Sequence, residues 1–260
     1  MAIIEKLTPG SFCWMELATT DQASAKQFYT SLFGWTATDF PMGPAGDYTI
    51  FGLKDQDCAA AYTLMKDQLE MGVPPHWGLY IGVVNVDEST ALAKELGATI
   101  LAGPFDVMDK GRMSIVRDPT GAHFCLWQEI TSKGIGISGE NNSFCWADLN
   151  TQDRDAAKKF YSALLGWTFV TGQGKDESSY WHIMNGEHGI GGVPPLEFQQ
   201  PGAPPHWMIY YQVASCDASF EKATSLGARG YMPPTSVDKN VRMAILGDPQ
   251  GAVFALFQGS

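Results

Sequence analysis

The sequence predicts an α+β protein made of two tandem copies of one module, with two βαβββ motifs in each copy. The main observation is a repeat, because residues 12–35 align with residues 144–167 at an offset of 132, with 13 identities in 24 positions. Two later pairs of segments align at an offset of 130: 74–87 with 204–217, and 111–128 with 241–258. Similarity spread over a whole module indicates duplication of that module.

The first helix of each copy is predicted from the spacing of its apolar residues. Residues 12–19 are rich in β-favouring types and predict a strand, after which Asp21 is a plausible N-cap. Gly34 and Gly166 stand where a helix end favours positive φ. The apolar face of one helix turn recurs in both copies: Ala25, Phe28, Tyr29 and Leu32, then Ala157, Phe160, Tyr161 and Leu164.

The rest of each copy repeats the same order of elements. Strands are expected near 47–53 and 58–64, followed by a Pro-rich loop, a strand at 77–84 and a helix at 87–96. The stretch before the second copy is rich in Gly, Ser and Asn and predicts a linker. The predicted division is therefore a first module at 1–130, a linker at 131–142 and a second module at 143–260.

Alternation along the first strand of each copy predicts one core face and one unusual face. The core faces are expected to hold Cys13, Met15 and Leu17 in the first copy, and Cys145, Ala147 and Leu149 in the second. The opposite faces hold Phe12, Trp14, Glu16 and Ala18, and Phe144, Trp146, Asp148 and Asn150. A strand face that mixes tryptophan with a carboxylate is unusual for a core layer, and we expect it to line a concave cup.

Composition and charge exclude several classes of partner. The formal net charge is -11 and there is no basic block, which argues against nucleic acid and anionic membranes. The N-terminus lacks the basic start and apolar stretch of a secretory signal, and no window has the ~20 apolar residues of a membrane span. Five cysteines without CxxC spacing are typical of reduced thiols in a cytoplasmic protein.

The motifs WMELATTDQASAKQFYTSLFGW and DPTGAHFCLW resemble the vicinal oxygen chelate superfamily, also known as the glyoxalase/bleomycin-resistance/dioxygenase superfamily. The resemblance covers both copies. It implies paired βαβββ motifs that curl into open curved barrels, each holding a small molecule. It also implies a divalent metal in the enzymes of the superfamily.

The residues at the metal-ligand positions implied by this resemblance differ from the usual ones. These positions hold Trp14, Tyr80 and Cys125 in the first copy, and Trp146, Tyr210 and Ala255 in the second. Metal sites need histidine, carboxylate or thiolate ligands, and tryptophan and alanine cannot ligate. We therefore expect no metal cofactor at the usual positions.

A displaced metal site is the alternative. Glu16, His76 and His123 share the predicted cup-facing parity and could bind Fe or Zn, whereas the second copy has Asp148 and His206 but Val253 as the third member. The structural alternative for His76 and His206 is a hydrogen bond at a strand entrance.

The hypothesis that follows is a small-molecule-binding protein, acting in sequestration or sensing, with aromatic-lined cups. The alternative is a glyoxalase-like lyase or isomerase, or an oxygenase, using the displaced metal. A monomer or a weak homodimer is expected. Arg112 and Arg242 are candidate partners of the two carboxylates if they face inward, and are surface residues otherwise. The candidate ligand-binding residues are Trp14, Glu16, Tyr80, Cys125, Trp127, Trp146, Asp148, Tyr210, Arg112 and Arg242.

Overall fold

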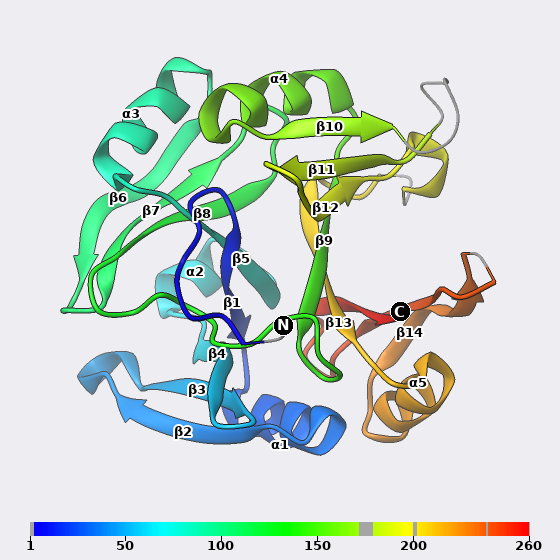
Figure 1. Cartoon of the computed structure of the whole chain (residues 1–260). Helices are drawn as coiled ribbons and strands as arrows, with labels where there is room; N and C mark the ends of the chain where they lie inside the picture. The colour runs from blue at the N-terminus through cyan, green and yellow to red at the C-terminus, as the bar shows by residue number, and fades with distance from the viewer. Residues whose placement is uncertain (1–2, 172–178, 200–201, 238, 260) are drawn as a thin grey trace.

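The computed structural model describes residues 3–171, 179–199, 202–237 and 239–259. It contains two eight-stranded mixed sheets, one built from each copy, in the strand orders β2-β3-β4-β1-β5-β8-β7-β6 and β10-β11-β12-β9-β13-β16-β15-β14 (Figure 1). Each sheet is therefore made within one copy, and so is the strand face that was expected to line a cup. The predicted α+β class and the four βαβββ units are confirmed.

The elements of the first module have the following bounds: β1 (Phe12–Thr19), α1 (Gln22–Phe33), β2 (Thr36–Pro41), η1 (Gly43–Ala45), β3 (Asp47–Leu53), β4 (Gln56–Thr63), α2 (Lys66–Glu70), β5 (His76–Gly82), α3 (Val86–Glu95), β6 (Thr99–Val107), β7 (Gly111–Arg117) and β8 (His123–Glu129). Those of the second module are β9 (Phe144–Asn150), α4 (Arg154–Leu165), β10 (Thr168–Thr171), β11 (Trp181–Asn185), β12 (His188–Val193), η2 (Leu196–Phe198), β13 (His206–Gln212), α5 (Cys216–Ser225), β14 (Arg229–Ser236), β15 (Arg242–Gly247) and β16 (Val253–Gln258).

The ends of α1 and α4 follow from their sequences as predicted. The carboxylate of Asp21 accepts a hydrogen bond from the backbone N–H of Ser24, and Asp153 caps α4 in the same way. Both helices end at a glycine with φ of 72°, Gly34 and Gly166. No helix within the described residues is long and apolar enough to cross a membrane.

A β-bulge changes the predicted faces of the first strand. The pairing of β1 with β5 shifts between Phe12 and Trp14, and β9 has the matching irregularity opposite Tyr210 and Tyr211. Phe12 therefore joins Met15 in the main core, whereas Cys13 packs beside Tyr80 on the opposite face. The predicted placement of Phe12 and Cys13 was wrong because strict alternation fails at a bulge.

The same bulge corrects the faces predicted for the second copy. Phe144 packs in the main core with Ala147 and Leu149, and Cys145 packs beside Trp146 and Tyr210. Beyond the bulge, alternation holds in both copies. Met15 and Leu17 lie in the core as expected.

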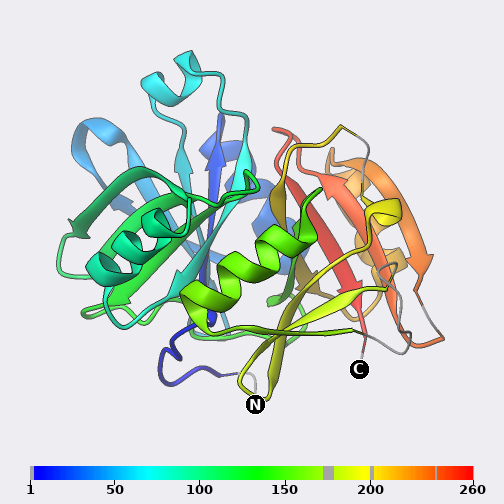
Figure 2. The same cartoon turned by 90° about the horizontal axis from the view of Figure 1, so that it is seen from above.

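The two modules share one core. Helix α1 lies beside α5, and α3 lies beside α4 (Figures 1 and 2). The ring of Phe28 in α1 packs on Phe254 of β16, and the ring of Phe160 in α4 packs on Phe124 of β8. Each module therefore uses its first helix to cover part of the other module's sheet.

Buried hydrogen bonds join the modules at equivalent places. The hydroxyl of Tyr29 donates to Asp248 at 3.0 Å and accepts from the indole of Trp77 at 3.0 Å. Tyr161 donates to Asp118 at 2.9 Å and accepts from Trp207 at 3.2 Å in the mirrored contact. Asp118 and Asp248, which open the DPTG and DPQG turns (DPxG), thus each contact a helix of the other module.

The segment predicted as a linker is packed against the first module. Ile135 and Ile137 are buried, and the backbone N–H of Ile135 donates to the carbonyl of Cys13 at 2.7 Å. Gly134 has φ of 94°, and a Cβ there would lie 2.0 Å from the carbonyl oxygen of Cys13. This close approach requires glycine. The segment fixes the start of β1 as well as connecting the modules.

Candidate functional site

The site in the first module lies on the face of its sheet opposite the helices, which we call cup face 1 and define by Trp14, Glu16 and Tyr80. The two oxygens of Glu16 accept hydrogen bonds from the hydroxyls of Tyr48 and Tyr80, at 2.6 and 2.8 Å. The indole N–H of Trp14 donates to the Tyr48 hydroxyl at 2.9 Å. Three strands, β1, β3 and β5, therefore meet at one carboxylate.

The second module builds the same cluster on cup face 2, defined by Trp146, Asp148 and Tyr210. The oxygens of Asp148 accept from the hydroxyls of Tyr180 and Tyr210, the latter at 2.8 Å. The indole N–H of Trp146 donates to Tyr180 at 2.7 Å and to Asp148 at 3.1 Å. The cluster of tryptophan, carboxylate and two tyrosines is thus present in both copies.

The electrostatics of both clusters are governed by burial. Removal from water raises the pKa of Glu16, and the hydrogen bonds from Tyr48 and Tyr80 oppose that rise. Burial likewise raises the pKa of Asp148, against its hydrogen bonds and the nearby His182. Burial and the adjacent carboxylate raise the pKa of Tyr80 well above its usual value, so its hydroxyl remains a hydrogen-bond donor at neutral pH.

Cup face 1 remains in contact with solvent at its centre. Glu16 is enclosed by side chains on its strand and both neighbours, yet it keeps part of its surface exposed. Trp14, Tyr48 and Tyr62 are also only partly buried. On cup face 2, Trp146 and Tyr180 are partly buried, whereas Asp148 is 6% exposed. Part of the aromatic surface is therefore exposed to solvent, more so in the first module.

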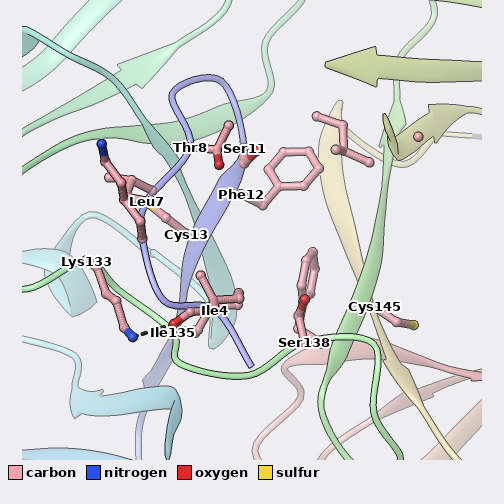
Figure 3. A pocket seen from close by; sticks show the side chains of 14 residues that line it. Ile4, Leu7, Thr8, Ser11, Phe12, Cys13, Lys133, Ile135, Ser138 and Cys145 are labelled. Atoms are coloured by element: carbon pink, nitrogen blue, oxygen red, sulfur yellow. Dashed lines mark hydrogen bonds between the residues drawn. The ribbon is translucent and has the colours of Figure 1, made fainter. Parts of the chain in front are cut away.

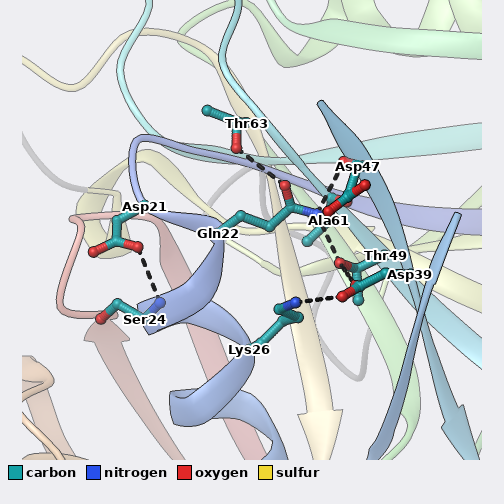
Figure 4. Close-up of polar contacts among 9 residues, drawn as sticks. All are labelled: Asp21, Gln22, Ser24, Lys26, Asp39, Asp47, Thr49, Ala61 and Thr63. Atoms are coloured by element: carbon teal, nitrogen blue, oxygen red, sulfur yellow. Dashed lines mark hydrogen bonds and ion pairs between the residues drawn. The ribbon is translucent and has the colours of Figure 1, made fainter. Parts of the chain in front are cut away.

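The start of α1 positions Tyr48 of β3. Gln22 donates to the hydroxyl of Thr49 at 2.6 Å and to the carbonyls of Asp47 and Ala61, at 3.0 and 3.2 Å (Figure 4). Asp47 and Thr49 flank Tyr48 on β3. The helix thereby holds the backbone of Asp47 and the side chain of Thr49, on either side of Tyr48.

Arg154 performs the same task in the second module. It occupies the place of Gln22 at the repeat offset and donates to the carbonyls of Ser179 and Val193, at 2.7 and 3.3 Å. Ser179 directly precedes Tyr180 in the chain. The guanidinium also lies 4.0 Å from the ring centroid of Trp181. Different side chains therefore hold equivalent tyrosines.

The remaining aromatic and sulfur candidates of the first module lie on cup face 1. Tyr80, Cys125 and Trp127 share one buried cluster, in which the rings of Tyr80 and Trp127 meet edge to face at 6.3 Å. The indole N–H of Trp127 donates to the carbonyl of Ser132 at 2.9 Å. Burial raises the pKa of the Cys125 thiol, which makes this cysteine a wall residue rather than a nucleophile.

Of the two alternatives for the arginines, the structure shows the surface one, and neither arginine pairs with a central carboxylate. Arg112 is bound to Asp87 and Asp106, at 2.8 and 2.7 Å, and Arg242 is bound to Asp217 at 2.8 Å. Met113, the next residue on β7, lies in the cup-face cluster, so Arg112 points to the helix side of the sheet. The carboxylates take tyrosine hydroxyls instead.

The residues present do not form the metal site that the superfamily implies. At the ligand positions, Trp14 and Tyr80 are engaged in the hydrogen-bonded cluster and offer no set of metal-binding atoms. Within the described ranges, no group of three or more His, Cys, Asp or Glu side chains could hold a metal ion. The displaced set of Glu16, His76 and His123 is therefore not brought together.

His76 and His206 have the structural hydrogen bond that was the alternative for them. Nδ1 of His76 lies 2.9 Å from the carbonyl oxygen of Pro74, and Nδ1 of His206 lies 2.8 Å from that of Pro204. Both histidines thus fasten the Pro-Pro turn to the strand that follows it.

Sequence reasoning missed Tyr48 and Tyr180, although a signal for them existed. They lie in a region where the two copies have little local similarity, but they are related by the repeat offset of 132. A search for polar aromatic residues shared at that offset would have found both. Tyr62, which faces Glu16 from β4, lacks such a signal because Pro194 occupies the equivalent position.

A separate cavity of about 230 Å³ lies where the modules meet. It is bordered by the starts of β1 and β9, the N-terminal segment and the connecting segment, as Figure 3 shows around Phe12, Cys13 and Cys145. The ammonium group of Lys133 donates a hydrogen bond to the carbonyl of Ile4. Neither Glu16 nor Asp148 borders this cavity, although Cys13 and Cys145, which do, pack beside Tyr80 and Tyr210 of the two cup faces.

Comparison with known proteins places both modules in one family. Residues 11–126 match the Glyoxalase/Bleomycin resistance protein/Dioxygenase superfamily, and residues 146–257 match a glyoxalase-like domain. "Putative glyoxylase CFP32" of Mycobacterium bovis is 35% identical over 245 residues, covering 94% of this chain and 93% of that protein. "Anthracycline biosynthesis protein DnrV" of Streptomyces peucetius is 32% identical over 267 residues, covering 97% and 94%.

Solved structures show the same fold at low sequence identity. A homoprotocatechuate 2,3-dioxygenase from B. fuscum aligns with a TM-score of 0.68 at 14% identity, over 100% of this chain and 74% of that chain. The Mn(II)-bound glyoxalase from Novosphingobium aromaticivorans aligns with a TM-score of 0.65 at 14% identity, over 99% and 83%.

Proposed function

This chain belongs to the glyoxalase/bleomycin resistance protein/dioxygenase superfamily, and from that premise we propose that it binds a flat aromatic small molecule on its cup faces. Binding serves sequestration or sensing and uses no metal at the usual ligand positions. The observation that carries the proposal is the duplicated cluster, in which an indole stands beside a tyrosine-bound carboxylate in both modules.

The rings supply the attraction for an aromatic guest. Trp14 and Tyr48 present partly buried rings next to each other, joined by a hydrogen bond that fixes their relative position. Aromatic surfaces held rigidly lose little conformational entropy on binding, and they stack on flat guests. The carboxylate of Glu16 gives the same face one polar group that orients the guest.

The name of one of the two relatives agrees with a guest of this kind. DnrV is named for the biosynthesis of anthracyclines, which are flat polycyclic aromatic compounds. The other candidate, a glyoxalase-like or oxygenase enzyme with a displaced metal, requires Glu16, His76 and His123 to converge. The structure offers no such group within the residues it describes, so we do not propose it.

The test is the binding of 2-(hydroxymethyl)anthraquinone, a neutral flat probe, followed by equilibrium dialysis and by quenching of tryptophan fluorescence. Wild-type protein is expected to bind it with quenching. Trp14→Phe removes part of the stacking surface and the hydrogen bond to Tyr48, so affinity at the first module should fall about fivefold. Trp146→Phe should act in the same way on the second module.

Trp181→Phe is the matched control, because Trp181 packs beneath Arg154 on the helix side of the second sheet. It should leave the affinity within twofold of wild type. If Trp14→Phe and Trp181→Phe lowered the affinity for the probe equally, the cup faces would not be the binding site. Absence of binding to wild-type protein would refute the proposal.

A further inference from the structure

The two clusters differ in the charge that surrounds their carboxylates. Both oxygens of Glu16 are bound by neutral tyrosine hydroxyls. Within the described ranges, no ion pair involves Glu16, and no cationic side chain is among the groups that shift its pKa. Arg112, which the sequence offered as a candidate partner for this carboxylate, forms ion pairs with Asp87 and Asp106 instead. Cup face 1 thus presents a carboxylate with no counter-charge of its own.

Aromatic rings add to the negative character of cup face 1. Tyr48 and Tyr80 donate hydrogen bonds to Glu16, and Trp14 donates one to Tyr48. Burial, together with the nearby charge of Glu16, raises the pKa of Tyr62 to about 12. The faces of such rings are negative in potential and attract cations. A carboxylate removed from water without a counter-ion is costly, and a cationic guest relieves that cost.

Cup face 2 has a histidine at a position where cup face 1 has an isoleucine. At the repeat offset of 132, His182 replaces Ile50 and Pro194 replaces Tyr62. The imidazole of His182 lies 5.0 Å from the ring of Tyr180 and 6.2 Å from that of Trp146, between centroids. His182 is also among the groups that lower the pKa of Asp148, after the hydrogen bonds from Tyr180, Tyr210 and Trp146. The second module therefore supplies from its own sequence what the first lacks.

We propose that cup face 1 selects an aromatic guest bearing an ammonium or similar cationic group, which pairs with Glu16, whereas His182 gives cup face 2 an internal partner for Asp148 and removes its need for a charged guest. The inference rests on the proposed function, since it specifies the chemistry of the guest at one of the two faces. The duplicated modules are then two sites of different specificity.

The experiment compares 2-(aminomethyl)anthraquinone, an ammonium at pH 7.5, with 2-(hydroxymethyl)anthraquinone, its neutral counterpart, by equilibrium dialysis. Wild-type protein should bind the ammonium probe at least about tenfold more tightly, at one site per chain, as expected for a charge-assisted contact. Glu16→Gln should reduce this preference to less than about twofold. Asp148→Asn is the control and should retain the wild-type preference.

Exchange of the residues that differ between the modules provides a second, independent readout. Ile50→His places the second module's imidazole in the first and should weaken the ammonium probe severalfold, with the carboxylate–tyrosine cluster left intact. His182→Ile should create a second ammonium-selective site, so the stoichiometry should rise from one to two. If Glu16→Gln fails to fold, this pair decides the question.

The outcomes distinguish a failure of cation selectivity at cup face 1 from a failure of aromatic binding as such. A preference that survives Glu16→Gln and Ile50→His, or that is lost in Asp148→Asn, overturns the inference. Binding of the neutral probe with no preference for the ammonium probe in wild-type protein also overturns it, but leaves the proposed function standing. Failure of both probes to bind at millimolar concentration refutes both.

Discussion

Glu16 and Asp148 differ from the other acidic side chains that the structure describes because each accepts hydrogen bonds from two tyrosine hydroxyls. Asp87 and Asp217 are paired with arginines on the helix side of the sheets, where water screens the interaction. The two central carboxylates are enclosed by rings and carry raised pKa values. Such an arrangement costs stability, as expected where a group is kept for binding.

The cost at Glu16 gives a prediction with a definite sign. Burial raises the folded-state pKa above the usual value of about 4.5, so the folded protein binds more protons than the unfolded chain as pH rises past 4.5. The contribution of this group to stability therefore falls with rising pH. Glu16→Gln carries no charge, and its Tm relative to wild type should increase between pH 4.5 and pH 7.5, measured by calorimetry.

The control for this prediction is Glu5→Gln, since Glu5 is exposed near the N-terminus. Its Tm should follow that of wild type at every pH. A difference in Tm between Glu16→Gln and wild type that stays constant with pH, or grows as pH falls, would contradict the raised pKa.

At the residue scale, alternation and the repeat predicted the central side chains but not their partners. Trp14, Glu16 and Tyr80 could be assigned to one face because side chains on strands alternate. Tyr48 could not be assigned, because its contact with Glu16 depends on how β4 and β3 follow β1 in the sheet. The face on which Arg112 lies could not be assigned for a similar reason. It depends on the register of β7 in the sheet, which turns Arg112 to the helix side and away from Glu16.

At the scale of elements, the first helix of each module is the part that joins the two copies. The hydroxyl of Tyr29 in α1 links Asp248 of the second module to Trp77 of the first, in a buried position. Helix α1 also fixes β3 through Gln22. The same helix thus supports the cluster of its own module and contacts the DPxG turn of the other.

Removal of one hydroxyl tests this joint role. Tyr29→Phe leaves the Asp248 oxygen and the Trp77 indole N–H without this partner in a buried place, so the free energy of unfolding should fall by about 1–3 kcal/mol. Tyr161→Phe should cost a similar amount. Urea unfolding measures both.

Tyr231→Phe serves as the matched control, because Tyr231 is 47% exposed on β14. It should change the free energy of unfolding by less than about 0.5 kcal/mol. A Tyr29→Phe variant as stable as Tyr231→Phe would show that the contact between the modules contributes nothing measurable.

Among the elements, long periodic helices and buried strands were predictable, whereas exposed and irregular ones were not. β2 was missed because all six of its residues are exposed and show no alternation of burial. The bulge at Phe12 and Trp14 moved Cys13 to the opposite face, and no sequence pattern marks it. The packed course of the connecting segment depends on the contact of Gly134 with Cys13, which only the folded chain reveals.

For the whole molecule, duplication explains both the symmetry of the fold and the differences between its sites. The sheets, the first helices and the central clusters repeat, so the architecture could be predicted from one alignment of the chain with itself. The cup faces differ at single positions, such as Ile50 against His182. Under the proposal, these differences give one chain two sites of unequal specificity.

The measurement that tests the central claim most directly is the dissociation constant of 2-(hydroxymethyl)anthraquinone for metal-depleted protein, compared with protein incubated with Mn(II), Fe(II) or Zn(II). Metal content is checked by mass spectrometry in each sample. Because the aromatic rings and the tyrosine-bound carboxylate make the site, we predict binding to the metal-depleted protein and a dissociation constant unchanged within about twofold by each metal. Binding that appears only with a stoichiometric metal would contradict the account.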